Sequence, residues 1–430
     1  MPKGRKKGGK KNNRNGVDSD DEIEGIDNGS VYSNQSDSRS AGTADGFTDD
    51  IDETSVQESF EDRLTDFIEM AGQKSAKGRT DCLNAISDAM RKKILLDFLY
   101  DRKLTVSDVI EKCLKKGKSA EQCAAAHCSA LLAVQLGLNV DTEEMFKTYK
   151  PILTTLMLDS SADLRARAAC SSALGLWAMI GASENAEEIL SVTQSLAKVF
   201  KSSFLKGDKT APTHSPEVTN LHNCALMSWG LLICLLPQQN VQDIVHNNLP
   251  RIQELLLSGD LDLRMTAGEI IALVYELASE INQNYQIPSH RILCEELREL
   301  STDSTKSKGK KERRTQRSTF RDVYKYVANG EIPSIKVHFG SEMLLIERWT
   351  EKRQYDFLCT LLKSGMNLHL AENEFLRDVF NLGPVIPTGL PKESRESRIQ
   401  RTLQNQAISK LRTQTRGKNR DKRSAIVHGE

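Results

Sequence analysis

Several features that would indicate a membrane protein or a secreted protein are missing from this 430-residue sequence. It has no run of eighteen apolar residues, so no membrane-spanning helix is expected. The basic N-terminal stretch is not followed by an apolar one, which excludes a secretory signal. The nine cysteines are odd in number and form no Cys-x-x-Cys pair. We therefore expect a reducing compartment, with the cysteines packed as small apolar groups.

Aromatic and apolar residues are also scarce, at 5% and 38% of the chain. A disordered fraction is therefore expected beside a folded part. The net charge is zero, but that total hides opposed blocks: residues 1–16 carry +7, residues 17–62 carry −14, and residues 306–325 and 392–430 carry +7 each. Such polar segments bury too little apolar surface to offset their chain entropy. Residues 1–58 are therefore predicted to be disordered, basic at first and then acidic.

Proline and strand-like alternation are rare between residues 59 and 302, where apolar residues follow a helical period. Segments 163–174 and 262–273 resemble each other: both begin with Asp-Leu-Arg and share alanines. Weaker copies near residues 122 and 77 fit the period of HEAT and armadillo repeats, and an insertion at about 206–216 lengthens one repeat. Small residues let neighbouring helices approach closely, and the opening Asp suits an N-cap. The predicted fold class is all-α, an armadillo/HEAT-like α-solenoid; the alternative is an irregular helical bundle.

The C-terminal part of the chain has a different character. We predict a basic linker at 303–317, a small, mainly helical module at 318–384, and a linker followed by a basic helix or tail at 385–430. Within the module, the pattern predicts helices over 318–329, 351–363 and 371–382, and a strand pair at 332–339 and 343–349. In the tail, the pattern favours a helix over 395–416 that ends at Gly417.

Motifs for catalysis are missing as well: the sequence has no GxGxxG, HExxH or GxSxG. Gly117-Lys118-Ser119 resembles the end of a phosphate-binding loop, but Lys112 occupies the position of the required first glycine. Cys123, His127 and Cys128 supply only three candidate zinc ligands in an alanine-rich helix, so packing is the favoured interpretation. We expect no enzyme activity, no catalytic residue, no metal, no cofactor and no small-molecule substrate.

Two basic clusters are the strongest functional signal, because such clusters neutralise phosphates and release counterions. No aromatic residue lies between 381 and 430, so binding is expected to depend on the nucleic-acid backbone and shape rather than on bases. The alternatives are a solvated tail or a nuclear-import signal. The candidate nucleic-acid-binding residues are Lys310, Lys311, Arg313, Arg314 and Arg317 in the first cluster, and Lys410, Arg412, Arg416, Lys418, Arg420, Lys422 and Arg423 in the second.

Three stretches resemble the interferon-related developmental regulator family: EKCLKKGKSAEQCAAA (111–126), QRSTFRDVYKYV (316–327) and SGMNLHLAENEFLRDVFNLGP (364–384). The order of the charged, repeat and C-terminal segments is also similar over roughly residues 60–425. The resemblance implies an armadillo-type solenoid, a family-specific C-terminal module and no enzymatic activity. It further implies one of two roles, namely ribosome binding with repression of translation, or transcriptional co-regulation through chromatin-modifying partners.

Two functional hypotheses follow. In the first, the solenoid docks on a ribosome or another RNA, the basic C-terminal region contacts phosphates, and translation is repressed. In the second, the chain is a nuclear scaffold for protein partners bound to the solenoid surface, and the tail serves only for transport. Taken together, the two hypotheses predict a cytoplasmic and nuclear location and no membrane partner.

Overall fold

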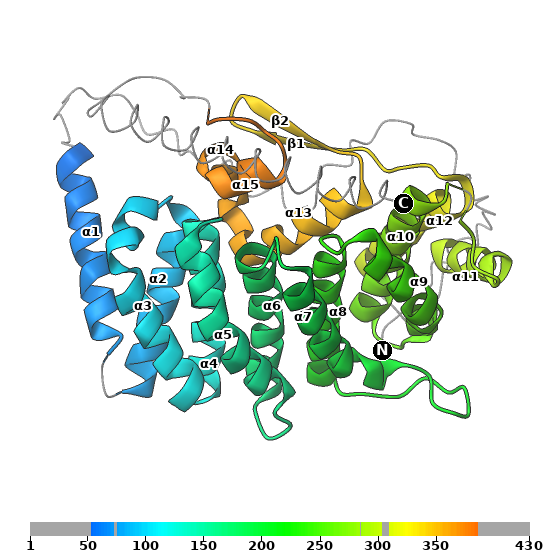
Figure 1. Cartoon of the computed structure of the whole chain (residues 1–430), viewed down its shortest axis with the longest axis horizontal. Helices are drawn as coiled ribbons and strands as arrows, with labels where there is room; N and C mark the ends of the chain where they lie inside the picture. The colour runs from blue at the N-terminus through cyan, green and yellow to red at the C-terminus, as the bar shows by residue number, and fades with distance from the viewer. Residues whose placement is uncertain (1–52, 73–74, 284, 303–308, 386–430) are drawn as a thin grey trace, which may run out of the picture. The chain divides into compact units, whose positions relative to one another are not determined.

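The computed structural model describes residues 53–72, 75–283, 285–302 and 309–385 (Figure 1). The predicted all-α class is confirmed in this part of the chain, where a single two-stranded sheet accompanies the helices. The helices of the repeat region are α1 (Glu53–Met70), α2 (Ala76–Lys92), α3 (Leu96–Lys116), α4 (Ser119–Leu136), α5 (Val140–Leu158), α6 (Leu164–Gly181), α7 (Ala186–Phe200), α8 (Pro216–Ile233), α9 (Gln238–Gln253), α10 (Leu261–Ile281) and α11 (His290–Thr302), with 3₁₀ turns η1 (Lys201–Ser203) and η2 (Glu254–Leu257). None of the described helices is long and apolar enough to cross a membrane.

These helices form a solenoid of helix pairs. The even-numbered helices α2, α4, α6, α8 and α10 pack against one another in order, and α3, α5, α7 and α9 pack beside them (Figure 1). The contact between α6 and α8 shows why small residues recur, because a Cβ atom added at Gly175 would lie 2.6 Å from Cβ of Ser228. The predicted repeat architecture is confirmed, and the interval between even-numbered helices is longest where the insertion at 206–216 precedes α8.

The predicted aspartate caps differ between the two strong copies. Asp163 is the N-cap of α6, and its carboxylate accepts the backbone N–H of Arg165 at 2.9 Å. In the second copy the cap is Asp260, which accepts the N–H of Leu263 at 2.9 Å. Asp262 therefore lies inside the first turn of α10 rather than at its N-cap, because a competing aspartate two residues earlier starts the helix sooner.

The predicted strand pair is confirmed, as β1 (Ile335–Phe339) and β2 (Glu342–Ile346) pair antiparallel. Helix α12 (Lys310–Asn329) precedes the hairpin, and α13 (Trp349–Leu362) follows it. The prediction of one helix over 371–382 is wrong. Two short helices, α14 (Met366–Glu372) and α15 (Glu374–Val379), meet at Asn373 instead. They follow the 3₁₀ turn η3 (Lys363–Gly365). Asn373 ends one helix and caps the next, since its Oδ1 accepts the N–H of Leu376.

The C-terminal segments lie across the solenoid. Helix α13 contacts α4, α8 and α10, and η3 contacts α2 (Figure 1). The approach at η3 is so close that a Cβ atom on Gly365 would lie 2.0 Å from the carbonyl oxygen of Arg91. Farther along, His369 Nε2 donates to the Met90 carbonyl, and Asn373 Nδ2 donates to the Val134 carbonyl. The residues predicted as an appended module thus pack along the even-numbered helices, and the described residues up to Gly383 form one compact unit.

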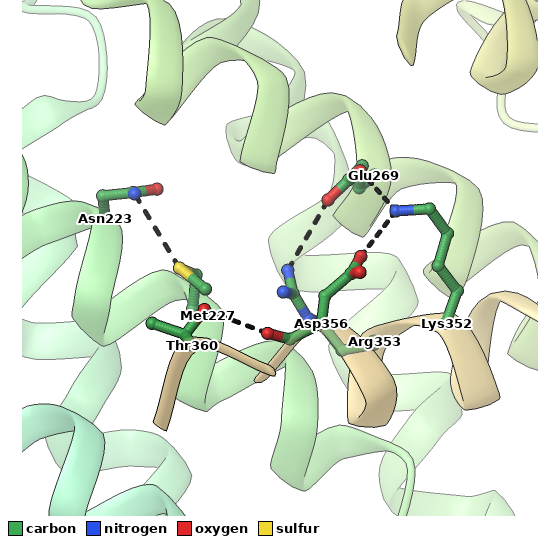
Figure 2. A network of polar contacts seen from close by, with 7 residues as sticks. All are labelled: Asn223, Met227, Glu269, Lys352, Arg353, Asp356 and Thr360. Carbon is green, nitrogen blue, oxygen red and sulfur yellow. Dashed lines mark hydrogen bonds and ion pairs between the residues drawn. The ribbon is translucent and has the colours of Figure 1, made fainter. Parts of the chain in front are cut away.

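An ion-pair network fixes α13 to α10 (Figure 2). Lys352 Nζ lies 2.7 Å from the carboxylate of Glu269 and 2.6 Å from that of Asp356. Burial alone would lower the pKa of Lys352, but the two carboxylates outweigh it and raise that pKa. The buried Arg353 guanidinium lies 3.7 Å from the same Glu269. The carboxylate of Glu269 on α10 therefore pairs with two cations of α13.

The N-terminus of α13 is capped by a buried carboxylate from the solenoid. Glu276 Oε1 accepts the N–H of Trp349 at 2.8 Å, and its Oε2 accepts the N–H of Thr350 at 2.9 Å. Glu276 is 6% exposed. A negative group at this position satisfies two N–H groups that the helix itself leaves without partners.

Replacing Glu276 by alanine is expected to lower the free energy of unfolding by about 1–2 kcal/mol, as for loss of a helix cap. Glu280→Ala, one turn later on α10, is the matched control, because Glu280 is exposed and pairs with an exposed Arg348. We expect a change within about 1 kcal/mol for this control. Urea denaturation followed by circular dichroism measures both variants, and equal effects would contradict a special role for Glu276.

Candidate nucleic-acid interface

The first basic cluster lies on a helix and not in a linker. Helix α12 begins at Lys310, so the predicted linker over 303–317 is wrong for its second half. Lysine, arginine and glutamate are good helix formers, and Glu312 Oε2 accepts the N–H of Gly309 at the helix start. A dense run of charges is typical of a linker, but these residue types also favour a helix, and the helix forms.

One side of α12 is held in the core. Phe320, Val323 and Val327 are buried, and a Cβ atom added at Gly268 of α10 would lie 2.7 Å from the Phe320 ring. The buried Gln316 Oε1 also accepts a hydrogen bond of 2.9 Å from Nη2 of Arg264. These contacts with α10 fix the rotation of α12 about its axis, and with it the side that faces solvent.

The solvent side of α12 is basic. Arg314, Arg317, Arg321 and Lys325 are all exposed and follow one another at intervals of three, four and four residues. Residues at these intervals share one face of a helix, with roughly 5–6 Å between neighbouring Cβ atoms. We call these four residues the α12 basic face. Because it contains no acidic residue, its side chains can all reach toward a single row of phosphates.

Two acidic residues border this face. Lys325 Nζ lies 3.9 Å from the carboxylate of Glu331, an exposed pair that stabilises little. Asp322 is half-buried, and burial raises the pKa of its carboxyl, although Lys352, Lys325 and Arg321 act in the opposite direction. The negative charges thus lie beside the row and not within it, and the row keeps its positive potential.

The structure separates the predicted site residues. Lys311, Arg314 and Arg317 are exposed, whereas Arg313 is half-buried. Lys310 is the first residue of α12. Arg321 and Lys325 are not among the predicted site residues, although their spacing from Arg317 places them on the same helix face.

The second predicted cluster lies outside the described residues, which end at 385. It comprises Lys410, Arg412, Arg416, Lys418, Arg420, Lys422 and Arg423, and its role stays a prediction. The predicted helix over 395–416 lies in the same undescribed part.

The segment that resembles a phosphate-binding loop, Gly117-Lys118-Ser119, lies at the start of helix α4. Lys118 is the N-cap of α4, and its N–H is accepted by the carboxylate of Glu121 at 2.9 Å. Glu121 is 2% exposed and pairs with Arg79 at 2.6 Å. A carboxylate thus already occupies the helix N-terminus where a phosphate would bind.

The three candidate zinc ligands do not converge. Cys123 Sγ and His127 Nδ1 lie 4.0 Å apart on α4. Cys128 is fully buried, and burial raises the pKa of its thiol to about 12. Among the described residues, no group of three or more His, Cys, Asp or Glu side chains has the arrangement of a metal site.

Two protein-family models match this chain. The family model described as "Interferon-related developmental regulator (IFRD)" matches residues 28–328, and a second, "Interferon-related protein conserved region", matches residues 373–424. The chain belongs to the interferon-related developmental regulator family. The first IFRD match includes the whole solenoid and α12 up to residue 328, so the basic face lies within the family region.

Relatives in this family align along most of the chain. Interferon-related developmental regulator 1 from human is 38% identical over 378 residues, covering 87% of this chain and 84% of the human protein. The pig protein of the same name gives the same identity and coverage. Interferon-related developmental regulator 2 from mouse is 39% identical over 379 residues, covering 88% of this chain and 86% of the mouse protein. The names of these relatives describe regulators and not enzymes.

Proposed function

We propose that this protein is a non-enzymatic regulator of gene expression that docks on ribosomes or other RNA through its basic C-terminal region and represses translation. The relatives named as developmental regulators support the general role. The observation that carries the RNA-binding part is the α12 basic face, a row of four exposed cations without an intervening acid.

The mechanism follows from the charge and from the scarcity of exposed aromatic groups. Cations spaced along one helix face neutralise successive phosphates and release bound counterions, which gives salt-sensitive affinity. The basic face itself contains no aromatic side chain to stack on bases, so it recognises the backbone and shape of the RNA. The second basic cluster, in the tail, adds further phosphate contacts to those of α12. The protein would then act wherever its RNA partner occurs, in the cytoplasm and the nucleus.

Sucrose-gradient fractionation of cell extract tests this proposal. The full-length protein is expected in ribosomal fractions at about 0.1 M salt, and raising the salt should release it. A chain lacking residues 395–430 should shift toward the free fractions and should repress an in-vitro translation reaction less than the full chain. Removing residues 1–52 gives a control deletion of the other charged end.

The opposite result would favour a scaffold for transcription, with protein partners on the solenoid surface. If the full-length protein never co-sediments with ribosomes, and deletion of 395–430 alters neither sedimentation nor translation, the ribosome proposal is wrong. Part of the even-numbered helices is covered by α13, so a protein partner would dock on what α13 leaves accessible.

A further inference from the structure

A cavity of about 280 Å³ lies where the C-terminal ends of α10 and α12 meet. Tyr275, Tyr285, Tyr326 and His290 line it together with the last turn of α12. The exposed Gln286 lies at its rim. This cavity is apart from the α12 basic face, because Tyr326 points to a different side of the helix from Arg321 and Lys325.

Three of the aromatic rings at the cavity contact one another. The rings of Tyr275 and Tyr285 have centroids 5.8 Å apart and meet at 71°, in an edge-to-face arrangement. The ring of His290 lies 5.9 Å from that of Tyr275, and Tyr275 Oη is hydrogen-bonded to His290 Nδ1 at 3.1 Å. This hydrogen bond holds the two rings in place. A tyrosine ring that lines the cavity attracts a positively charged group that lies against its face.

Backbone carbonyl groups at the cavity carry partial negative charge. The Lys325 and Tyr326 carbonyls accept the Gly330 N–H, which leaves the last three carbonyls of α12 without an acceptor role inside the helix. Helix α10 also ends here, at Ile281. The C-terminal end of each helix carries a partial negative charge. Two helix ends therefore point the same sign of charge at one cavity.

The nearby ionised side chains act in the same direction. Burial, together with the carboxylates of Glu276 and Glu280, raises the pKa of Tyr326 to about 12, against the opposing effect of Arg348. Two carboxylates thus face a single guanidinium around the ring. A phosphate or a carboxylate ligand would be repelled from such a site, whereas an organic cation would be attracted.

We propose that this tyrosine-lined cavity binds a cationic side chain of a partner protein, an arginine or a methylated lysine. The ring walls take the face of the guanidinium or the methyl groups, and the carbonyls at the end of α12 accept its N–H groups where it has them. This site is independent of the proposed RNA docking, since it needs none of the four residues of the basic face.

Binding can be measured with three capped tripeptides: Gly-Arg-Gly, Gly-trimethyllysine-Gly and the neutral Gly-norleucine-Gly. The full-length protein is prepared with ¹³C-labelled tyrosine rings, and Tyr285→Phe assigns the ring signals of residue 285. We expect saturable shifts of the Tyr285 signals with one or both cationic peptides and none with norleucine. Equal binding of norleucine, or no binding of any peptide at millimolar concentration, would overturn the proposal.

Variants of the wall and the rim sharpen the test. Tyr285→Ala should weaken binding of the cationic peptide about 3- to 30-fold, while Tyr285→Phe keeps the ring and the affinity. Gln286 is exposed, so Gln286→Lys and Gln286→Glu leave the packing unchanged and should weaken and strengthen binding, respectively. Tyr100→Ala, at an exposed tyrosine of α3, is the control and should have no effect. If Tyr285→Ala fails to fold, the two variants of Gln286 still test the proposal. Equal effects of Gln286→Lys and Gln286→Glu on binding would refute a cation site in this cavity.

Discussion

Replacing Arg377 by methionine is expected to lower the free energy of unfolding of the C-terminal segments by about 3–5 kcal/mol, because it leaves a carboxylate and several carbonyls without their donor. Arg377 is 2% exposed, and its guanidinium forms a two-pronged pair with Glu342 at 2.9 and 2.7 Å. The same guanidinium donates to the carbonyls of Leu370, Ala371, Leu382 and Gly383. One side chain thus ties α14, α15, the hairpin and the end of the compact unit together.

Hydrogen exchange at the β1–β2 amides is the best measurement, since a repeat protein need not unfold in one step. Arg377→Lys should recover only part of the protection, because an ammonium group cannot form the planar, two-pronged pair. Arg348→Met removes an exposed arginine from a pair with Glu280 and should change protection by less than about 1 kcal/mol. Protection in Arg377→Met that matches the unchanged protein would refute this account.

The same pair makes a pH dependence expected. The hydrogen bonds from Arg377 lower the pKa of the Glu342 carboxyl below its ordinary value. A carboxyl whose pKa is lowered by folding contributes stability above its unfolded-state pKa and loses it as the pH falls through its folded-state pKa. Protection of the hairpin should therefore decline in that acidic range, and the decline should be absent in Glu342→Gln, which has no carboxyl to titrate.

Reversing three charges of the α12 basic face, with Arg314→Glu, Arg317→Glu and Arg321→Glu, is expected to weaken RNA binding by at least about tenfold at 0.1 M salt. Each lost phosphate contact should also reduce the slope of log affinity against log salt by about one. Filter binding with a double-stranded RNA over a range of salt concentrations gives both quantities. The fold should be unchanged, because all three side chains are exposed.

A control with the same change in net charge separates position from charge. Lys112→Glu, Lys116→Glu and Lys147→Glu alter exposed lysines on α3 and α5. These helices lie at the other end of the repeat order from α12. If the α12 basic face is the binding site, this variant should keep most of the slope of log affinity against log salt. If both triple variants lose the same affinity, net charge and not the α12 basic face governs binding.

Periodic patterns in the sequence were sufficient to predict the helical repeats and the hairpin. Alanine and glycine recur where even-numbered helices touch, as at Gly175, and a buried helix is apolar on all sides. Both signals are local in the chain, and so is the alternation of Val337 and Phe339 with exposed residues in β1. The start of α12 differs from the prediction because a run of charges is typical of a linker, although the same residues favour a helix.

Which residues meet across long distances in the chain was decided by the tertiary structure alone. A burial pattern says that a side chain is covered, but it does not say by what, because many partners of similar size would fit. Arg377 and Glu342 are 35 residues apart, and Asn373 and Val134 are 239 apart. Periodicity and charge distribution in the sequence thus determined a helical chain with charged ends. The packing of α13 on α4, α8 and α10, the side of α12 that faces solvent and the tyrosine-lined cavity all arise from contacts that only the folded chain brings together.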